Sequence, residues 1–195
     1  GYFLLGLTFP LAAAESGSAS MGEERSGALG VSDDGRFFTL DGVPTFLLGV
    51  SYYGALSIPS EERVRLDLDA MAEDGFNWIR VWVFWDHESA KYSALEPDGR
   101  PREPYLARLK TLIEECAKRR IVVDCSLRRE ASSTRFPGTF QQHRACAESL
   151  ARELLPYHNV YLDLANERDV RDARYVSVEE VGKLIAAVRE VDPAR

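Results

Sequence analysis

The sequence predicts an α/β fold of the TIM-barrel type, (β/α)8, limited to about its first four βα units and preceded by an N-terminal β-hairpin. Strand-like and helical segments alternate at spacings of roughly 30–45 residues, which is typical of a parallel sheet covered by helices. The predicted strands have an aliphatic side and a side with aromatic and charged residues. The chain has 195 residues, 45% of them hydrophobic, which is enough for one sizeable core.

The start of the chain is apolar. A short apolar run from Phe3 to Leu11 is followed by three alanines and a polar stretch. This pattern predicts a partial secretory signal peptide over 1–14 and a polar linker over 15–33, and hence a secreted or periplasmic protein. The alternative is a buried N-terminal strand, since the run is too short to span a bilayer. A whole barrel takes about 250 residues, so 34–195 is expected to be the N-terminal half of one.

The first elements of the folded part follow from turn and cap signals. Two β-type runs in 37–49 flank Asp41-Gly42, which indicates a hairpin, and the second run leads into a strand. A helix is then predicted between Ser60, a good N-cap followed by two acidic residues, and Gly75, a good terminator.

Hydrophobic periodicity predicts the remaining elements. They are a strand over 76–84, a helix from Pro104 through Arg120, a strand over 121–126, a helix over about 139–155, a strand over 159–165, and a helix that starts at the capping box Ser177–Glu180. The last helix is expected to bury Val181, Leu184, Ile185 and Val188.

The two faces of the strands favour a barrel. A doubly wound open sheet, the competing solution, has helices on both faces and should show two aliphatic faces. Here one face is aliphatic, and strand parity places Arg80, Asp124, Asp163 and Glu167 together on the other, as expected of the inside and mouth of a barrel.

Composition narrows the classes of function. A net charge of −7 argues against nucleic acid as a partner, because phosphates require a basic face. The three cysteines, Cys116, Cys125 and Cys146, have no metal-ligand spacing and are expected to be small apolar fillers. We therefore expect no cofactor, no metal and no membrane partner.

The strand over 159–165 runs into Asn166 and Glu167. Catalytic groups of barrel enzymes lie at the C-terminal ends of strands, so Glu167 is the candidate catalytic residue. The alternative is that Asn166 caps a helix and Glu167 interacts with its dipole. The capping box at Ser177 argues against this alternative, because the next helix already has its own cap.

Arg80 is the second candidate. A guanidinium that points into a barrel keeps its charge and must meet carboxylates. A purely structural ion pair with Asp163 is the alternative, and the two roles are compatible. Aromatic side chains near strand ends suit sugar rings, so Tyr52, Trp85 and His87 are candidate substrate contacts. By contrast, the rings of residues 82 and 84 are expected to fill the interior.

Three segments carry a family resemblance. "DGRFFTLDGVPTFLLGVSYYG", "DGFNWIRVWVF" and "YLDLANERD" together resemble the retaining glycoside hydrolases of clan A, especially family 5, which are cellulase- and mannanase-like barrels. The resemblance covers about residues 35–195. It implies hydrolysis of β-O-glycosidic bonds in a polysaccharide or oligosaccharide, with a β-linked glycan as partner and a monomer when the protein is full length.

The resemblance also implies residue roles. Glu167 matches the general acid/base, and Asn166 matches the residue that hydrogen-bonds the sugar 2-hydroxyl. Arg80 matches an arginine near the nucleophile, and Asp163 matches an acid common four residues before the acid/base. The nucleophilic glutamate of the family ends the seventh strand and lies outside this chain, so the chain alone is expected to be inactive.

Three other functions stay open at this point. A non-catalytic carbohydrate-binding relative would keep the barrel without hydrolysis. A metal-dependent barrel hydrolase is disfavoured by scarce histidine. A structural half-barrel could dimerise through its open sheet edges.

Overall fold

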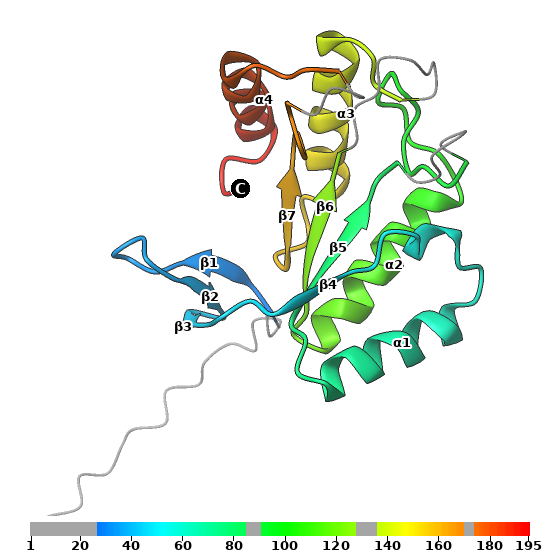
Figure 1. Ribbon diagram of the computed structural model, residues 1–195, viewed down its shortest axis with the longest axis vertical. Helices are drawn as coiled ribbons and strands as arrows, with labels where there is room; N and C mark the ends of the chain where they lie inside the picture. Colours follow the sequence, from blue (N-terminus) through cyan, green and yellow to red (C-terminus); the bar gives the residue numbers. More distant parts are fainter. Residues whose placement is uncertain (1–26, 85–90, 128–135, 170–173) are drawn as a thin grey trace, which may run out of the picture.

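The computed structural model describes residues 27–84, 91–127, 136–169 and 174–195 (Figure 1). The expected signal peptide lies outside the described residues. The elements in chain order are β1 (Leu29–Val31), β2 (Phe38–Leu40), β3 (Val43–Pro44), β4 (Gly49–Ser51), the 3-10 helix η1 (Ala55–Ser57), α1 (Glu61–Glu73), β5 (Trp78–Trp82), α2 (Tyr105–Lys118), β6 (Val122–Ser126), α3 (Phe140–Glu153), β7 (Val160–Asp163) and α4 (Val178–Val191).

The strands form two sheets. Strands β4, β5, β6 and β7 pair in parallel and in chain order, and each is followed by a helix. Strands β1, β2 and β3 form a small antiparallel sheet. The predicted α/β class, the four βα units and the preceding hairpin at Asp41-Gly42 are thereby confirmed. Of the helices described, none combines the length and the apolar character needed to cross a membrane.

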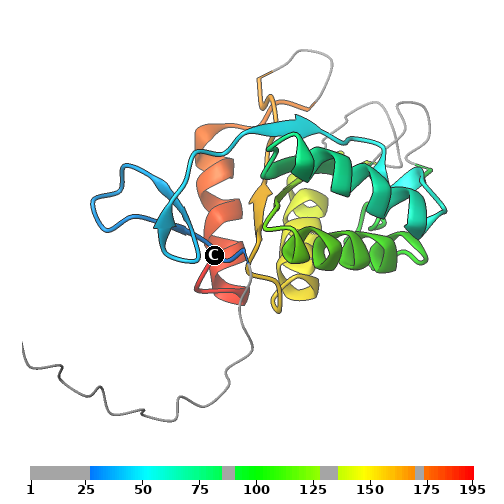
Figure 2. The same ribbon diagram turned by 90° about the horizontal axis from the view of Figure 1, so that it is seen from below.

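The parallel sheet has the two unlike faces that the sequence predicts. Ile79 and Val81 of β5 are fully buried in the hydrophobic core with residues of the helices. Trp78, Arg80 and Trp82 alternate with them and are only half-buried. Figure 2 shows the helices gathered along the sheet, with the small sheet set apart at one side. The polar face of the sheet is therefore the one that can hold a site.

The helices begin where their caps predict. The side chain of Ser60 accepts a hydrogen bond from the backbone N–H of Arg63 at the start of α1. Ser177 and Glu180 form both bonds of a capping box at the start of α4. Each cap satisfies backbone donors that the first helical turn leaves without partners, which fixes where the chain leaves the preceding loop.

The small sheet lies at the N-terminal ends of the parallel strands (Figure 1). The backbone N–H of Leu29 donates to the carbonyl of His158, just before β7, at 2.9 Å. The carboxylate of Asp41 accepts from the backbone N–H groups of Gly27 and Ala28, and it pairs with Arg120 at 2.7 Å. The small sheet thus contacts the end of the parallel sheet opposite to the strand ends where catalytic groups are expected.

Two expectations need correction. β1 lies inside the range 15–33 assigned to the linker; a three-residue strand with a central glycine is too short to show alternation, and it exists because it pairs with β2. Ile185, expected to be buried, is 40% exposed. The buried face of α4 is centred on Leu184 with Ala187 and Val188 beside it, so Ile185 lies off its edge.

Gly49 of β4 leaves room for the ring of Trp78 on β5. A Cβ atom at this position would lie 1.8 Å from Cε3 of Trp78. No side chain can occupy that space unless the indole moves. Because the indole N–H of Trp78 is part of the polar face described below, the glycine determines more than local packing.

We expect Gly49→Ala to lower the free energy of unfolding by about 3 kcal/mol or more, because the new methyl group overlaps a half-buried ring. Gly182→Ala is the matched control, since open space surrounds Gly182 in α4. This control should raise the free energy of unfolding by about 0.5–1 kcal/mol through helix propensity. Urea unfolding of the two variants measures both effects, and equal stability of the two would contradict the packing at Gly49.

Candidate active site

The polar face of the sheet is organised around Arg80. Its Nε atom donates to Oδ2 of Asp124 on β6 at 2.8 Å, and its Nη2 atom lies 3.7 Å from Oδ2 of Asp163 on β7. The register of the sheet explains the contact, because Arg80 and Asp124 are direct neighbours across β5 and β6. The predicted meeting of Arg80 with Asp124 and Asp163 is thereby observed, with Asp124 as the closer partner. Glu167, which strand parity also placed on this face, makes no hydrogen bond or ion pair with Arg80.

Asp124 is fully buried, and both oxygens of its carboxylate accept hydrogen bonds. Oδ2 also accepts from the hydroxyl of Tyr161 at 3.1 Å, and Oδ1 accepts from the hydroxyl of Ser126 at 3.0 Å. Burying a carboxylate is costly unless an opposite charge and several donors compensate for the lost water. Arg80, Tyr161 and Ser126 supply this compensation.

The indole of Trp78 completes the group. Its Nε1 atom donates to the hydroxyl of Tyr161 at 2.8 Å, so this hydroxyl accepts from Trp78 and donates to Asp124. Burial, followed by the charge of Asp124, raises the pKa of Tyr161. The phenol therefore stays protonated and acts as a fixed donor. The guanidinium of Arg80 also lies over the Trp78 ring, 5.5 Å from its centre.

Asp163 is less well compensated than Asp124. Burial is the largest cause that raises its pKa, and the negative charge of Asp124 adds to it. The backbone N–H of Ala165, Arg80 and Ser126 act in the opposite direction without cancelling the effect. The folded state thus favours the protonated form of the Asp163 carboxyl group relative to the unfolded chain.

Asn166 is oriented by the same arginine. Nη1 of Arg80 lies 3.2 Å from Oδ1 of Asn166. A guanidinium can only donate, so the oxygen of the amide must face Arg80. Nδ2 of Asn166 then points its two hydrogens elsewhere, and it meets no acceptor among the described residues. The amide is thus presented as a hydrogen-bond donor.

Glu167 follows in a tight turn. β7 ends at Asp163, and residues 166–169 form a turn rather than a helix. Glu167 has φ = 48°, in the left-handed region that residues with a Cβ atom adopt at a cost. Its side chain is exposed, and its carboxylate makes no hydrogen bond or ion pair with the described residues. A helix capped by Asn166 is therefore not observed.

The structure does not bring every predicted residue to this group. The hydroxyl of Tyr52 donates to Asp67 of α1 at 2.7 Å, so the ring is directed to the helical side of the sheet. Trp85 and His87 lie outside the described residues. Within the described ranges, no cluster of histidine, cysteine and acidic residues is arranged to hold a metal ion.

Neighbouring aromatic and hydroxyl side chains add to this face of the sheet. Tyr53 is 39% exposed and packs its ring against Trp82, with ring centres 5.8 Å apart. Trp78, Tyr161 and Ser126 form the hydrogen-bond network beneath Arg80. Strand parity could have identified these three, because each lies on the same face as Arg80 in its own strand.

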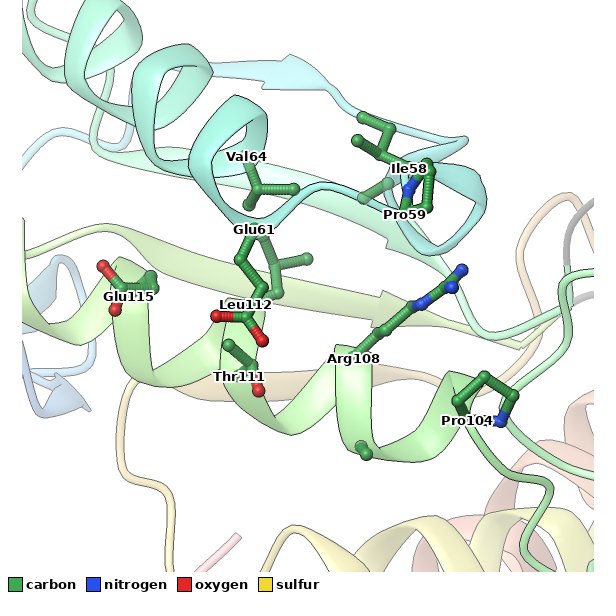
Figure 3. A pocket seen from close by; sticks show the side chains of 11 residues that line it. Ile58, Pro59, Glu61, Val64, Pro104, Arg108, Thr111, Leu112 and Glu115 are labelled. Carbon is green, nitrogen blue, oxygen red and sulfur yellow. The ribbon is translucent and has the colours of Figure 1, made fainter.

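A separate cavity lies on the helical side of the sheet. It has a volume of about 240 Å³ between α1 and α2, and Figure 3 shows Glu61 and Arg108 extending across it from these helices. Nη1 of Arg108 donates to the carbonyl of Leu56 at 2.9 Å. None of the residues around Arg80 lines this cavity, so it is distinct from the candidate site.

Comparison with known proteins shows the class of fold. No family model matches the sequence, and no curated protein matches it. Similar solved structures include a family 5 glycoside hydrolase from Bacteroides vulgatus, with 18% identity over 85% of this chain and 38% of that one, and a TM-score of 0.61.

A second similar structure is an exo-β-1,4-mannosidase from an Opitutaceae bacterium, with 20% identity, a TM-score of 0.60, and coverage of 89% of this chain and 34% of that one. A third, described as a glycoside hydrolase, has 17% identity, a TM-score of 0.63, and coverage of 86% and 39%. The chain thus has the fold of part of a family 5 glycoside hydrolase barrel. It spans well under half the length of these proteins.

We expect ionisation of Asp163 to lower the free energy of unfolding as the pH rises. Because the folded state raises the pKa of Asp163, its contribution is fully present below the unfolded value of about 3.9 and is lost as the pH rises through the folded value. The stability of Asp163→Asn relative to the unmodified chain should therefore increase from about pH 4 upward. Urea unfolding between pH 3 and 7 measures this difference.

Glu115 provides a control of opposite sign. Hydrogen bonds from Lys118 and Arg119 lower the pKa of Glu115 to about 2. The stability of Glu115→Gln relative to the unmodified chain should fall as the pH rises from about 2 to 5. A stability difference for Asp163→Asn that is flat with pH would contradict the assignment of Asp163.

The turn at Glu167 can be tested with a pair of substitutions. Glu167→Gly should have a free energy of unfolding about 1 kcal/mol higher than Glu167→Ala, because only glycine adopts the left-handed conformation without cost. The same pair at Glu62, exposed within α1, should give the reverse order. Equal stability of the two Glu167 variants would mean that the turn is not left-handed in solution.

Proposed function

We propose that the full-length protein hydrolyses β-O-glycosidic bonds by a retaining, two-carboxylate mechanism, with Glu167 as general acid/base. The observation that carries the proposal is the contact between Arg80 and Asn166. It orients the amide as a donor directly beside Glu167, at the C-terminal end of a barrel strand. The family 5 likeness of the fold and of the sequence segments supports the same assignment.

The proposed chemistry assigns distinct tasks to the two residues. Asn166 donates from Nδ2 to a sugar hydroxyl, which holds the ring beside the carboxyl group. Glu167 protonates the oxygen of the leaving group and later removes a proton from the attacking water. In the first step the bond between C1 and the leaving oxygen breaks while a nucleophilic carboxylate bonds to C1, and in the second step water replaces that carboxylate.

The nucleophile must lie about 5–5.5 Å from the acid/base in a retaining enzyme. Asp124 cannot take this role, because it is fully buried and bonded to Arg80, Tyr161 and Ser126. We therefore propose that the nucleophile comes from outside this chain and that the 195 residues alone do not hydrolyse glycosides. A β-linked glycan is the proposed substrate class.

We expect Glu167→Gln to lower kcat on β-mannan or β-glucan by about 10²- to 10⁴-fold in the full-length protein, because the amide cannot donate a proton to the leaving group. For aryl β-glycosides with acidic leaving groups, the rate of the bond-breaking step should fall less, because such leaving groups need little protonation. Asp169→Asn, a neutralisation of an exposed carboxylate in the same turn, is the control and should keep kcat.

Hydrolysis rates on the two kinds of substrate decide the assignment. Unchanged activity in Glu167→Gln would remove Glu167 from the mechanism. Binding of the glycan with no hydrolysis by the unmodified full-length protein would instead support the non-catalytic carbohydrate-binding alternative.

A further inference from the structure

A buried histidine lies behind the end of β7. His143, on α3, is fully buried, and its Nε2 atom is hydrogen-bonded to the backbone carbonyl of Leu164. Leu164 directly follows β7 and precedes Asn166 by two residues. The imidazole thus contacts the backbone that leads from the sheet into the turn with Asn166 and Glu167.

The protonation state of His143 follows from its second neighbour. Nη2 of Arg174 lies 2.9 Å from Nδ1 of His143. Because a guanidinium has no acceptor, Nδ1 must accept and carries no proton. The proton of the neutral ring is therefore on Nε2, where it is donated to the carbonyl of Leu164. The arginine selects the tautomer that can hold this carbonyl.

Arg174 is itself held in place. Its Nη1 atom lies 3.2 Å from both carboxylate oxygens of Glu180, which also forms the capping box of α4. The three side chains therefore connect α3, the end of β7 and the start of α4. Nearby, the backbone N–H of Val176 donates to the carbonyl of Arg168 at 2.9 Å, which joins the turn to the residues just before α4.

We propose that His143 and Arg174 are positioning residues for Asn166 and Glu167. The turn is held on one side by Arg80 through Asn166 and on the other by His143 through Leu164. A left-handed residue such as Glu167 keeps its conformation only where the surrounding structure determines it. The role proposed for the histidine rests on the function proposed for Glu167, because the turn is the part of the site that must be placed accurately.

The tautomer is tested on the unmodified 195-residue chain. Two-bond 1H–15N correlation spectra distinguish protonated from unprotonated ring nitrogens, and the chain has three histidines to assign. We expect His143 at pH 7 to carry its proton on Nε2 with Nδ1 bare. A proton on Nδ1, or a doubly protonated ring, would overturn the proposal without any measurement of activity.

Substitution tests the positioning role. In His143→Phe and in Arg174→Met, the amide of Val176 should exchange its hydrogen at least 10-fold faster, while amides of β5 keep their protection. His158→Gln is the matched control, since His158 is exposed and lies at the opposite end of β7. Arg174→Met also keeps the proposal testable if His143→Phe does not fold. Unchanged exchange at Val176 in Arg174→Met would overturn the proposal.

In the full-length protein, both substitutions should lower kcat by about 10- to 100-fold with less than a threefold change in KM, whereas His158→Gln should keep both. A lower melting temperature with unchanged kcat per folded molecule would indicate a merely structural role and overturn the proposal. If Glu167→Gln keeps full activity while the tautomer and exchange results hold, the proposed function fails and His143 remains a determinant of the turn.

Discussion

The permanent charge of Arg80 is the constraint on which the polar face of this sheet depends. A guanidinium cannot become neutral, so wherever the fold partly buries it, carboxylates must accompany it. Oδ2 of Asp124 lies 2.8 Å from Nε of Arg80 and supplies the opposite charge. Asp124 is itself fully buried, so its lost hydration must be replaced by hydrogen bonds. Tyr161 and Ser126 are present for that reason. The polar residues of three neighbouring strands therefore form one interdependent group, in which loss of any member leaves a charge or a donor without its partner.

This group also joins the packing of the sheet to the orientation of the candidate site. Gly49 leaves room for the Trp78 ring, whose N–H fixes the hydroxyl of Tyr161, and that hydroxyl donates to Asp124. Asp124 holds Arg80, and Arg80 faces the amide oxygen of Asn166. Each step is a directional hydrogen bond or a steric contact. A glycine in the first parallel strand thus influences how an amide is presented beyond the fourth strand.

The elements were predictable from the sequence because they rest on local signals. The caps at Ser60 and Ser177 and the alternation around Arg80 determine where helices start and which face is polar. The parity of the strands also placed Arg80 with Asp124. The features that the sequence did not predict depend on contacts between segments that are distant in the chain. β1 forms because it pairs with β2, and the hydroxyl of Tyr52 donates to Asp67 of α1. Ile185 is exposed because α4 packs through Leu184, Ala187 and Val188. The histidine behind β7 was missed because a single buried imidazole has no sequence pattern.

The proposed reaction at Glu167 needs groups that these four βα units do not supply. Glu167 is exposed, and among the described residues no carboxylate contacts it. Arg80 and His143 fix the backbone around it from two sides, so its place is determined even though its surroundings are open. The nucleophilic carboxylate of the proposed mechanism would have to come from further barrel strands. The geometry of the turn is therefore set by contacts within this chain, whereas the proposed reaction also needs a carboxylate from elsewhere.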